Sequence, residues 1–404
     1  MIILLNSGSL EKEVYKMRAW AEINLDAITN NIQKIKNITS EKTKIMAIVK
    51  ADAYGHGFFE VASTLATNGA DAFGVATTDE AIQLRNAGIT NPILILGVIF
   101  RDDLKKIIEN DIMPVVFGYR FAKSISDMAV MLNKTVKIHI KLDTGMSRIG
   151  YVCSGSDREE RILESICDIA ALPNIEIDGI FSHFAKADEC DRQYTDTQFK
   201  RFMHIIEELE KRNIYIPTKH ICNSAGIIQY PEYHLDMVRC GIITYGLAPS
   251  EDVDIKELGL EPAMQLKSVV TNLKRMKVDT PVSYGGKYIA KPGTRIATVG
   301  IGYADGYSRV LSGKSQIIID GKKVDTIGNI CMDQLMADVT DISDINIGDE
   351  VILFGTDGNN TITVESVAKL MGTINYETIC VVGKRVPRVY IRNGKTVNVV
   401  NYLV

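Results

Sequence analysis

The sequence of 404 residues lacks the features that mark several large protein classes. Its seven cysteines are odd in number, scattered and never arranged as C-x-x-C. This argues against a disulfide framework or a zinc cluster and is typical of a protein of the reducing cytoplasm. Neither sign of charge dominates, since the formal net charge is −4, and this disfavours nucleic acid and strongly charged partners. Small molecules are therefore the expected partners.

Long apolar runs are also missing. None approaches the roughly 20 residues needed to cross a bilayer, and the apolar start at residues 1–5 is too short for the core of a signal peptide. We therefore expect neither a membrane anchor nor secretion. Residues 1–17 are predicted to be a loose extension, and Met17 is a second candidate for the start of translation.

What the sequence does contain is an alternation of short apolar runs with longer segments of helical period, from residue 44 to about 246. This pattern is typical of a parallel sheet built from βα units, and the clearest helix is predicted at residues 195–211. We count eight runs, which is the number that closes a (β/α)8 TIM-type barrel, whereas a doubly wound sheet would usually have fewer. They lie at residues 45–50, 72–76, 93–97, 113–117, 136–142, 177–182, 219–223 and 237–245.

After about residue 250 the pattern changes to short strands joined by hairpin turns, as around Asp320-Gly321. This predicts a second, mostly β domain, with one helix at residues 363–371. The predicted division is an extension at 1–17, an α/β barrel at 18–250 and a mostly β domain at 251–404. With 46% hydrophobic and 24% charged residues, the composition is that of a soluble chain of two domains.

A lysine ends the first apolar run. Lys50 would thus lie at the C-terminal end of a strand, where barrel active sites are built. Desolvation there would lower its pKa and favour the neutral amine that a Schiff base needs. The position alone is equally consistent with a lysine whose amine reaches solvent. Tyr54 and the turn glycines Gly55 and Gly57 favour the chemical interpretation.

The segment Val-Lys-Ala-Asp-Ala-Tyr-Gly-His-Gly at residues 49–57 closely resembles the cofactor-lysine motif of bacterial alanine racemases. Further motifs in the family's order extend the resemblance from residue 20 to residue 388. The resemblance implies a barrel that binds pyridoxal 5′-phosphate (PLP), followed by a β domain, in a homodimer with active sites shared between subunits. It implies that Lys50 carries PLP as a Schiff base and that Tyr54 contacts its phosphate. The implied activity is interconversion of L- and D-alanine, which supplies D-alanine for peptidoglycan.

The resemblance assigns further barrel residues to the cofactor. Residues 141–148 look like the family's Lys-x-Asp-Thr-Gly-Met-x-Arg element, in which Arg148 would bond the cofactor's phenolic oxygen and also contact the substrate, while Lys141 is the position carbamylated in many members. Arg239 would bond the pyridine nitrogen, and His183 would bond Arg239. The phosphate would lie near four residues of the last two barrel loops: Asn223, Ser224, Gly241 and Ile242.

Arg239 has a chemical meaning in this assignment. Because an arginine is permanently protonated, it cannot readily protonate the ring nitrogen, and the cofactor becomes a weaker electron sink. This suits racemisation and disfavours transamination. Without the resemblance, His183 would be interpreted as an ordinary core or surface histidine and Asn223 as a helix cap.

Racemisation also needs a base on the face opposite Lys50. Residues 282–286, Val-Ser-Tyr-Gly-Gly, resemble the family's second-base motif, so Tyr284 of the partner subunit is expected to serve the L-alanine face and Lys50 the D-alanine face. A chain from Tyr284 through His183 to Arg239 would assist the phenol. The resemblance also has the backbone of Met332 receive the substrate carboxylate, and it places three residues at the entrance: Tyr303, Arg309 and Asp188.

Two positions depart from the family's pattern. Lys384 stands where the family has a tyrosine before Arg-Val-Pro-Arg, and this leaves one phosphate contact open. Asn329 stands where many members have an arginine near the entrance. No metal is expected.

Three alternatives remain beside the leading hypothesis. A racemase of serine or of broad specificity is hard to separate, because one hydroxyl group is a weak basis for discrimination in a small pocket. A PLP-dependent decarboxylase of the same architecture would use an acidic residue at the pyridine nitrogen, so Arg239 argues against it. A PLP carrier protein would need only the barrel and Lys50, so Tyr284 argues against that.

Overall fold

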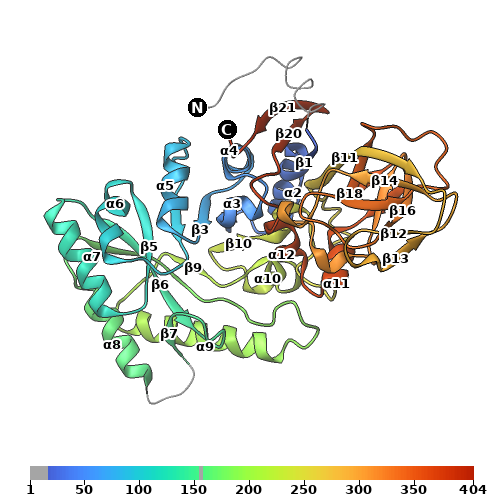
Figure 1. Cartoon of the computed structure of the whole chain (residues 1–404). Coiled ribbons are helices and arrows are strands. Elements are labelled where there is room, and N and C mark those ends of the chain that lie inside the picture. Colours follow the sequence, from blue (N-terminus) through green and yellow to red (C-terminus); the bar gives the residue numbers. More distant parts are fainter. Residues whose placement is uncertain (1–16, 154–157) are drawn as a thin grey trace. The chain divides into compact units, whose positions relative to one another are not determined.

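A computed structural model describes residues 17–153 and 158–404, so all but the last residue of the predicted extension lies outside the described residues. The described chain divides into two compact units, coloured by sequence in Figure 1. The barrel unit comprises Ile28–Ala53 and Phe58–Glu261. The β unit comprises residues 17–27, Tyr54–Gly57 and Pro262–Val404.

The centre of the barrel unit is a set of eight parallel strands: β2 (Lys44–Ile48), β3 (Ala72–Val75), β4 (Ile93–Ile95), β5 (Ile112–Val116), β6 (Val136–Asp143), β8 (Ile175–Phe181), β9 (Thr218–His220) and β10 (Met237–Cys240). Their order in the sheet is β10-β2-β3-β4-β5-β6-β8-β9. Two backbone hydrogen bonds of 3.1 Å, from Asp236 to Lys219 and from Arg239 to Cys222, join the two ends. Each strand coincides with one predicted apolar run, and the predicted (β/α)8 barrel is confirmed.

Helices alternate with these strands and lie outside them (Figure 1). The predicted helix at residues 195–211 is confirmed as α9 (Gln193–Lys211), which buries Phe202, Ile205 and Leu209 at spacings of three and four residues. Each such side chain stabilises the fold by about 1.5–3 kcal/mol when fully buried. The other helices are α2 (Leu25–Ile38), α4 (Phe58–Asn68), α5 (Thr78–Asn86), α6 (Leu104–Glu109), α7 (Tyr119–Met131), α8 (Glu159–Ala170) and α10 (Ser224–Gln229).

The β unit is built on an antiparallel sheet whose longest strand is β11 (Met264–Arg275). Because β11 pairs with both β14 and β18, six strands close into a ring in the order β11, β14 (Arg295–Val299), β17 (Leu335–Asp338), β16 (Lys322–Ile327), β15 (Gln316–Ile319) and β18 (Glu350–Asp357). The remaining elements are β12 (Thr280–Val282), β13 (Tyr288–Ala290), β19 (Asn360–Ile362), β20 (Arg388–Arg392), β21 (Lys395–Val400), α11 (Val364–Met371) and α12 (Asn375–Cys380).

Strand β1 (Ala19–Asn24) extends this sheet, although it lies within the range predicted for the barrel. It pairs antiparallel with β11 and parallel with β20. Its apolar residues, among them Trp20, are buried there. A short apolar strand carries no sequence signal for its partner, so the sequence did not place it in this sheet.

Local signals in the β unit act as predicted. The β15–β16 hairpin turns at Asp320 and Gly321, whose φ angles of 50° and 65° fit a turn with two left-handed residues. Helix α11 begins where the side chain of Thr363 accepts a hydrogen bond from the Ser366 N–H, and it ends at Gly372 with φ 73°. Within the described part of the chain, no helix combines the length and apolar character needed to span a bilayer.

Candidate active site

The backbone after β2 takes an unusual path at Lys50. The turn α3 (Lys50–Tyr54) is left-handed, with φ between 52° and 55° at each of the four residues from Ala51 to Tyr54. Each such residue costs about 1–2 kcal/mol, so the surroundings must hold the turn. The carboxylate of Glu80 does so at the start, because it accepts hydrogen bonds from the N–H groups of Ala51 and Ala76, both at 2.7 Å. The turn sets where the partly exposed Lys50 leaves the barrel.

The loop that follows admits only glycine at two positions. Gly55 and Gly57 have φ angles of 79° and 90°, and a Cβ on Gly57 would lie 1.7 Å from the hydroxyl of Tyr390. The turn predicted from these glycines is therefore present. Tyr54 is buried, and burial raises the pKa of its phenol, which therefore stays protonated and able to donate a hydrogen bond.

A buried arginine holds the same loop within the β unit. Arg388 is 2% exposed, and its Nε donates to the carbonyl of Gly55 at 2.9 Å. Its other two nitrogens donate to three further carbonyls, those of Val382 (2.7 Å), Gly383 (2.8 Å) and Val386 (2.5 Å). Among the described residues it makes no ion pair, and its charge is balanced by these backbone dipoles and by the Tyr402 ring, whose centre lies 5.4 Å from Cζ.

A second buried arginine lies in the barrel. Arg239 is 3% exposed and donates through NH1 to Nδ1 of His220 at 2.9 Å. Its NH2 donates to Nδ1 of His183 at 3.1 Å and to the carbonyls of Ser182 and Ile221, both at 2.8 Å. The predicted contact between His183 and Arg239 is thus present. None of these bonds starts from Nε, which is the nitrogen that Arg388 uses for Gly55.

Burial sets the charge of this cluster. It lowers the pKa of Arg239 to about 10, which leaves the guanidinium charged at neutral pH. Burial, followed by the charge of Arg239, also lowers the pKa of His183 and His220 well below the usual value. Both imidazoles are therefore neutral at pH 7, and Arg239 keeps a positive charge with neutral acceptors around it.

Lys141 lies next to this cluster on β6. It is 3% exposed, and its Nζ lies 4.7 Å from the centre of the Phe181 ring. Burial, followed by the charges of Arg239 and Arg148, lowers the pKa of Lys141 well below its usual value. The amine therefore loses its proton far more readily than a surface lysine does.

The loops that end β6 and β9 are shaped by side chains at their starts. Oδ1 of Asp143 accepts from the N–H groups of Gly145 (3.0 Å) and Ser147 (2.9 Å), and this fixes the loop before the exposed Arg148. Asn223 caps α10 by accepting from the Gly226 N–H at 3.0 Å.

The hydroxyl of Ser224 accepts from the Gly241 N–H at 3.0 Å, one residue before the short helix η4 (Ile242–Tyr245). Ser224 and Gly241 are thus together, as predicted. Asp188 contributes a backbone carbonyl that accepts from the hydroxyl of Ser250 at 2.9 Å, and it is not among the clustered groups.

In the β unit, three predicted segments are joined by hydrogen bonds. Tyr284 opens the turn η5 (Tyr284–Gly286), and its carbonyl accepts from the side-chain amide of Asn329 at 2.6 Å. The N–H of Tyr303 donates to the carbonyl of Cys331, and the next N–H donates to the carbonyl of Met332, both at 3.0 Å. The side chains of Tyr284, Tyr303 and Met332 are 71%, 40% and 52% exposed.

The two remaining predicted residues of the β unit are not drawn into this group. Arg309 is an exposed residue of the short helix η7 (Arg309–Leu311). Lys384 has its Nζ 6.0 Å from the centre of the Tyr402 ring.

The sequence-based prediction missed Glu80, His139, Asp178 and His220. For His139 a signal exists, since β6 carries polar residues at alternate positions 137, 139, 141 and 143. Alternate residues of a strand share a face, so a titratable face on a buried barrel strand marks a polar interior. Glu80 and Asp178 contact residues that are distant in the sequence and come close only in the folded chain, so no local pattern indicates their contacts.

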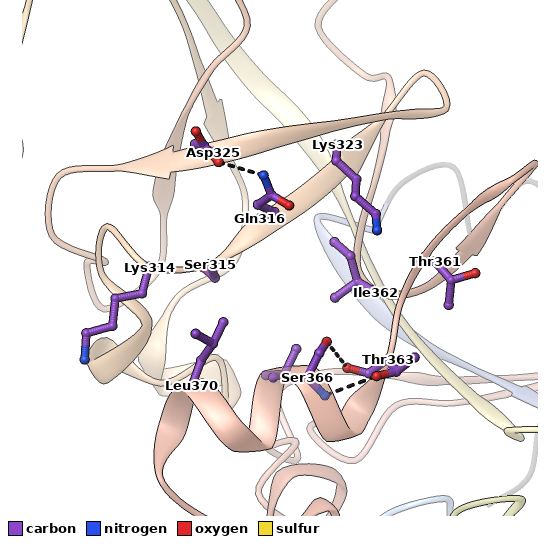
Figure 2. A pocket seen from close by; sticks show the side chains of 11 residues that line it. Lys314, Ser315, Gln316, Lys323, Asp325, Thr361, Ile362, Thr363, Ser366 and Leu370 are labelled. Atoms are coloured by element: carbon purple, nitrogen blue, oxygen red, sulfur yellow. Dashed lines mark hydrogen bonds between the residues drawn. The ribbon is translucent and has the colours of Figure 1, made fainter.

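One cavity lies apart from all these residues. It has a volume of about 380 Å³ and is lined by residues of β15, β16, α11 and the segments beside them, such as Lys314, Lys323 and Ser366 (Figure 2). None of the predicted site residues lines it. The cavity therefore adds nothing to the candidate site.

Comparison with known proteins gives a consistent match over both units. The family described as "Alanine racemase, N-terminal domain" matches residues 23–249, and "Alanine racemase, C-terminal domain" matches residues 263–390. An alanine racemase of Methanococcus maripaludis is 48% identical over 372 residues, which are 92% of this chain and 98% of that protein.

Solved structures agree with this match. An alanine racemase of Clostridium difficile 630 superposes with a TM-score of 0.91 at 41% identity and covers 96% of this chain and 100% of that one. A structure of the Clostridium difficile 630 protein in complex with cycloserine gives a TM-score of 0.89 at 40% identity, with 96% and 100% of the two chains covered.

Proposed function

This chain belongs to the alanine racemase family and is a racemase of alanine, and on that premise we propose that it carries PLP on Lys50 and uses Lys50 and Tyr284 as its two bases. The observation that carries the proposal is Arg239. It is a buried, charged donor whose Nε makes no hydrogen bond to any described group, although its other nitrogens are engaged. Such a nitrogen is suited to an acceptor atom of a bound ring.

The donor set of the barrel fits PLP. Arg239 would hold the pyridine nitrogen, Arg148 the phenolic oxygen, and Lys50 the aldehyde carbon. The phosphate would lie against Tyr54 and the groups of the last two loops: Asn223, Ser224, Gly241 and Ile242. When bound, PLP withdraws electrons from the bond between Cα and its hydrogen. Arg239 limits that withdrawal, since it does not give its proton to the ring nitrogen.

Each of the two bases would then act on one face of the substrate. Lys50 would remove or return the α-proton on the D-alanine face, and Tyr284 would do so on the L-alanine face. His183 accepts from Arg239 through Nδ1, so its proton is on Nε2. This leaves the Nε2–H of His183 as a hydrogen-bond donor for the oxygen of Tyr284.

A second copy of the chain would bring Tyr284 to Lys50. The support is the exposure of Tyr284, Tyr303 and Met332, which lie on three segments of the β unit and would be covered together in a dimer. In that dimer, the backbone of Met332 would receive the substrate carboxylate, and Tyr303, Arg309 and Asp188 would line the entrance.

Lys141 would be modified by carbon dioxide. Its amine, with a pKa well below that of a surface lysine, attacks the carbon of CO₂ and releases one proton, which gives a carbamate. The resulting anion would be stabilised by Arg148 and Arg239, whose charges disfavour the ammonium form. Carbon-13 NMR of the protein in labelled bicarbonate, with Lys141→Arg as the control, tests this step.

The experiment for Lys50 is chemical trapping. Borohydride treatment of the purified protein with PLP should fix the cofactor to Lys50, as read by peptide mass spectrometry. Lys50→Arg should lose the label and the conversion of L-alanine to D-alanine, as read by chiral chromatography. A label on another lysine would overturn the assignment.

The experiment for Tyr284 is proton exchange in heavy water. Tyr284→Phe should suppress racemisation by about 10²–10⁴-fold, the usual contribution of a general acid or base. It should still exchange the α-proton of D-alanine without inversion, because Lys50 serves that face. Racemisation at the original rate would contradict the two-base scheme. The same assay with L-serine measures how strictly alanine is preferred.

A further inference from the structure

A row of hydrogen-bonding groups runs across the barrel from Arg239. NH1 of Arg239 lies 2.9 Å from Nδ1 of His220, and Nε2 of His220 lies 3.0 Å from Nδ1 of His139. Nε2 of His139 lies 3.6 Å from a carboxylate oxygen of Asp178. The four groups come from β10, β9, β6 and β8, and both imidazoles are buried.

The proton positions in this row follow from Arg239. A guanidinium only donates, so Nδ1 of His220 must be a bare acceptor. Because His220 is neutral, its proton is on Nε2 and is donated to Nδ1 of His139. His139 in turn carries its proton on Nε2, the nitrogen that faces Asp178. This arrangement satisfies both hydrogen bonds of the row and leaves only Nε2 of His139, which faces Asp178, without a hydrogen-bond partner among the described residues. The opposite arrangement sets an N–H of His220 against an N–H of Arg239.

The strand pairing places Asp178 for this contact. Ile138 of β6 pairs with Ile177 of β8, but the next residue, His139, pairs with Gly179. Asp178 is thus the extra residue of a β-bulge, a feature that redirects a side chain. Gly179 makes room for the ring, since a Cβ there would lie 2.3 Å from Nδ1 of His139. At 3.6 Å the carboxylate is too far for a well-formed hydrogen bond, yet it is the anion that favours a proton on Nε2.

We propose that His139 is a positioning residue for Arg239: its Nδ1 accepts a hydrogen bond from the Nε2–H of His220, which keeps Nδ1 of His220 unprotonated and so fixes the guanidinium in one orientation. The function of this arrangement is to hold a charged arginine with neutral acceptors. A carboxylate next to Arg239 would hold it too but would cancel its charge. Here the anion, Asp178, is kept two rings away. The role of Arg239 at the cofactor rests on the proposed function, whereas the hydrogen bonds that hold Arg239 do not depend on it.

The test is the tautomer of His220, read by nitrogen-15 NMR of the imidazoles in the purified protein. With only six histidines in the chain, substitution of each one assigns the spectrum. Wild-type His220 and His139 should both carry their protons on Nε2, with and without PLP. A proton on Nδ1 of wild-type His220 would overturn the proposal without any variant.

Two variants of nearly the same size separate positioning from packing. In His139→Asn the side-chain oxygen can replace Nδ1 as an acceptor, whereas His139→Leu has none. His139→Asn should keep His220 in the Nε2–H form and keep kcat within about twofold. His139→Leu should give mixed His220 tautomers and a kcat lower by about three- to tenfold, with KM for alanine unchanged.

Equal behaviour of the two variants would show that His139 only fills space, and this would refute the proposal. If Leu at position 139 prevents folding, a proton on Nδ1 of wild-type His220, or loss of the Nε2–H form of His220 in His139→Asn, would still refute the proposal. A failure of the proposed function is distinguishable, because it would show as absent trapping on Lys50 with the His220 tautomer as predicted.

Discussion

The two buried arginines of this chain are held in different ways. Arg388 in the β unit spends all three guanidinium nitrogens on four backbone carbonyls. Arg239 in the barrel unit binds two imidazoles and two carbonyls through NH1 and NH2, and it leaves Nε without a bond to any described group. We call the first arrangement closed, because every guanidinium nitrogen is bonded, and the second open, because Nε is not. A closed arginine stabilises the backbone, whereas an open one can also bind a ligand.

The open arrangement has an energetic consequence. A hydrogen bond to a charged group contributes about 1.5–3 kcal/mol. The Nε of Arg239 can therefore contribute to binding a ligand, whereas all three guanidinium nitrogens of Arg388 are already bonded within the β unit. Substitutions at the two positions should thus affect different measurements.

The largest effect is expected for Arg388→Ala. It would leave buried carbonyls without donors, and each such group costs about 1–3 kcal/mol, so the free energy of unfolding should fall by more than about 3 kcal/mol. Urea unfolding can be followed through Trp20, the one tryptophan of the sequence, which is buried in β1 of the β unit.

The control for that experiment is Arg385→Ala. Arg385 lies in the same segment but is 39% exposed in its side chain, and its ion pair with Asp333 is screened by solvent. Its Nε also lies 3.7 Å from the buried carboxylate of Asp305, which keeps its closer ion pair with Arg18 when Arg385 is removed. It should cost about 1 kcal/mol or less. Equal losses for the two variants would mean that Arg388 is not a special support of the loop at Gly55.

The next largest effect is expected when each of the two arginines is replaced by lysine. Arg239→Lys should lower kcat by about 10- to 100-fold, because hydrogen bonds to a charged group are worth about 1.5–3 kcal/mol, and its loss of activity should exceed its loss of stability. Arg388→Lys should do the reverse. Steady-state kinetics and urea unfolding of both proteins test this. The comparison would break if both variants lost stability and activity in the same proportion.

Residue-level signals explain which parts of the structure the sequence predicts. Apolar periodicity located the eight barrel strands, the local pattern located the helix at residues 363–371, and Asp320-Gly321 located the hairpin, because these signals act within a few residues. The bond from Arg388 to Gly55 joins residues 333 positions apart, and the approach of His220 to His139 requires β6, β8 and β9 to be aligned. The bulge at Asp178 depends on the same alignment, so no local pattern indicates it.

The resemblance to a family supplied what local patterns do not. Arg239 and His183 were paired on that basis, and the structure places them in contact. The sequence does not predict the left-handed turn after Lys50, because alanines rarely adopt the positive φ angles that they have there.

A smaller effect concerns pH and belongs to the barrel. The folded-state pKa of His220 lies well below its unfolded value of about 6.5. As the pH falls below that value, the unfolded state takes up a proton that the folded state refuses, so the stability present above pH 6.5 is lost. One histidine contributes about 1.4 kcal/mol per pH unit in this range.

The measurement is urea unfolding at pH 7.5 and at pH 5.5 for the wild type and for His220→Asn. Asparagine keeps an acceptor for Arg239 but has no proton to take up in this range. The variant should therefore lose about 1.4 kcal/mol less than the wild type between the two pH values. An identical loss would mean that His220 is protonated in the folded state.

The smallest effect is expected at the turn of Tyr284. This turn is exposed to solvent, and we expect it, like Arg239, to contact a bound ligand. Asn329→Asp removes the amide that donates to the Tyr284 carbonyl and keeps the shape of the side chain. It should lower kcat by about two- to tenfold, the equivalent of one ordinary hydrogen bond. Asn360 is the matched control, because its amide donates at the same distance of 2.6 Å to the carbonyl of Gly321 in a hairpin that carries no site residue.

Asn360→Asp should cost comparable stability and leave kcat unchanged. If both variants lowered kcat equally, the loss would come from a weaker β unit and not from the position of Tyr284. If Asn329→Asp alone lowered it, Asn329 would be the residue that fixes Tyr284 in this chain. The β unit would then contain one side chain that only stabilises the backbone, Arg388, and one that positions a catalytic residue, Asn329.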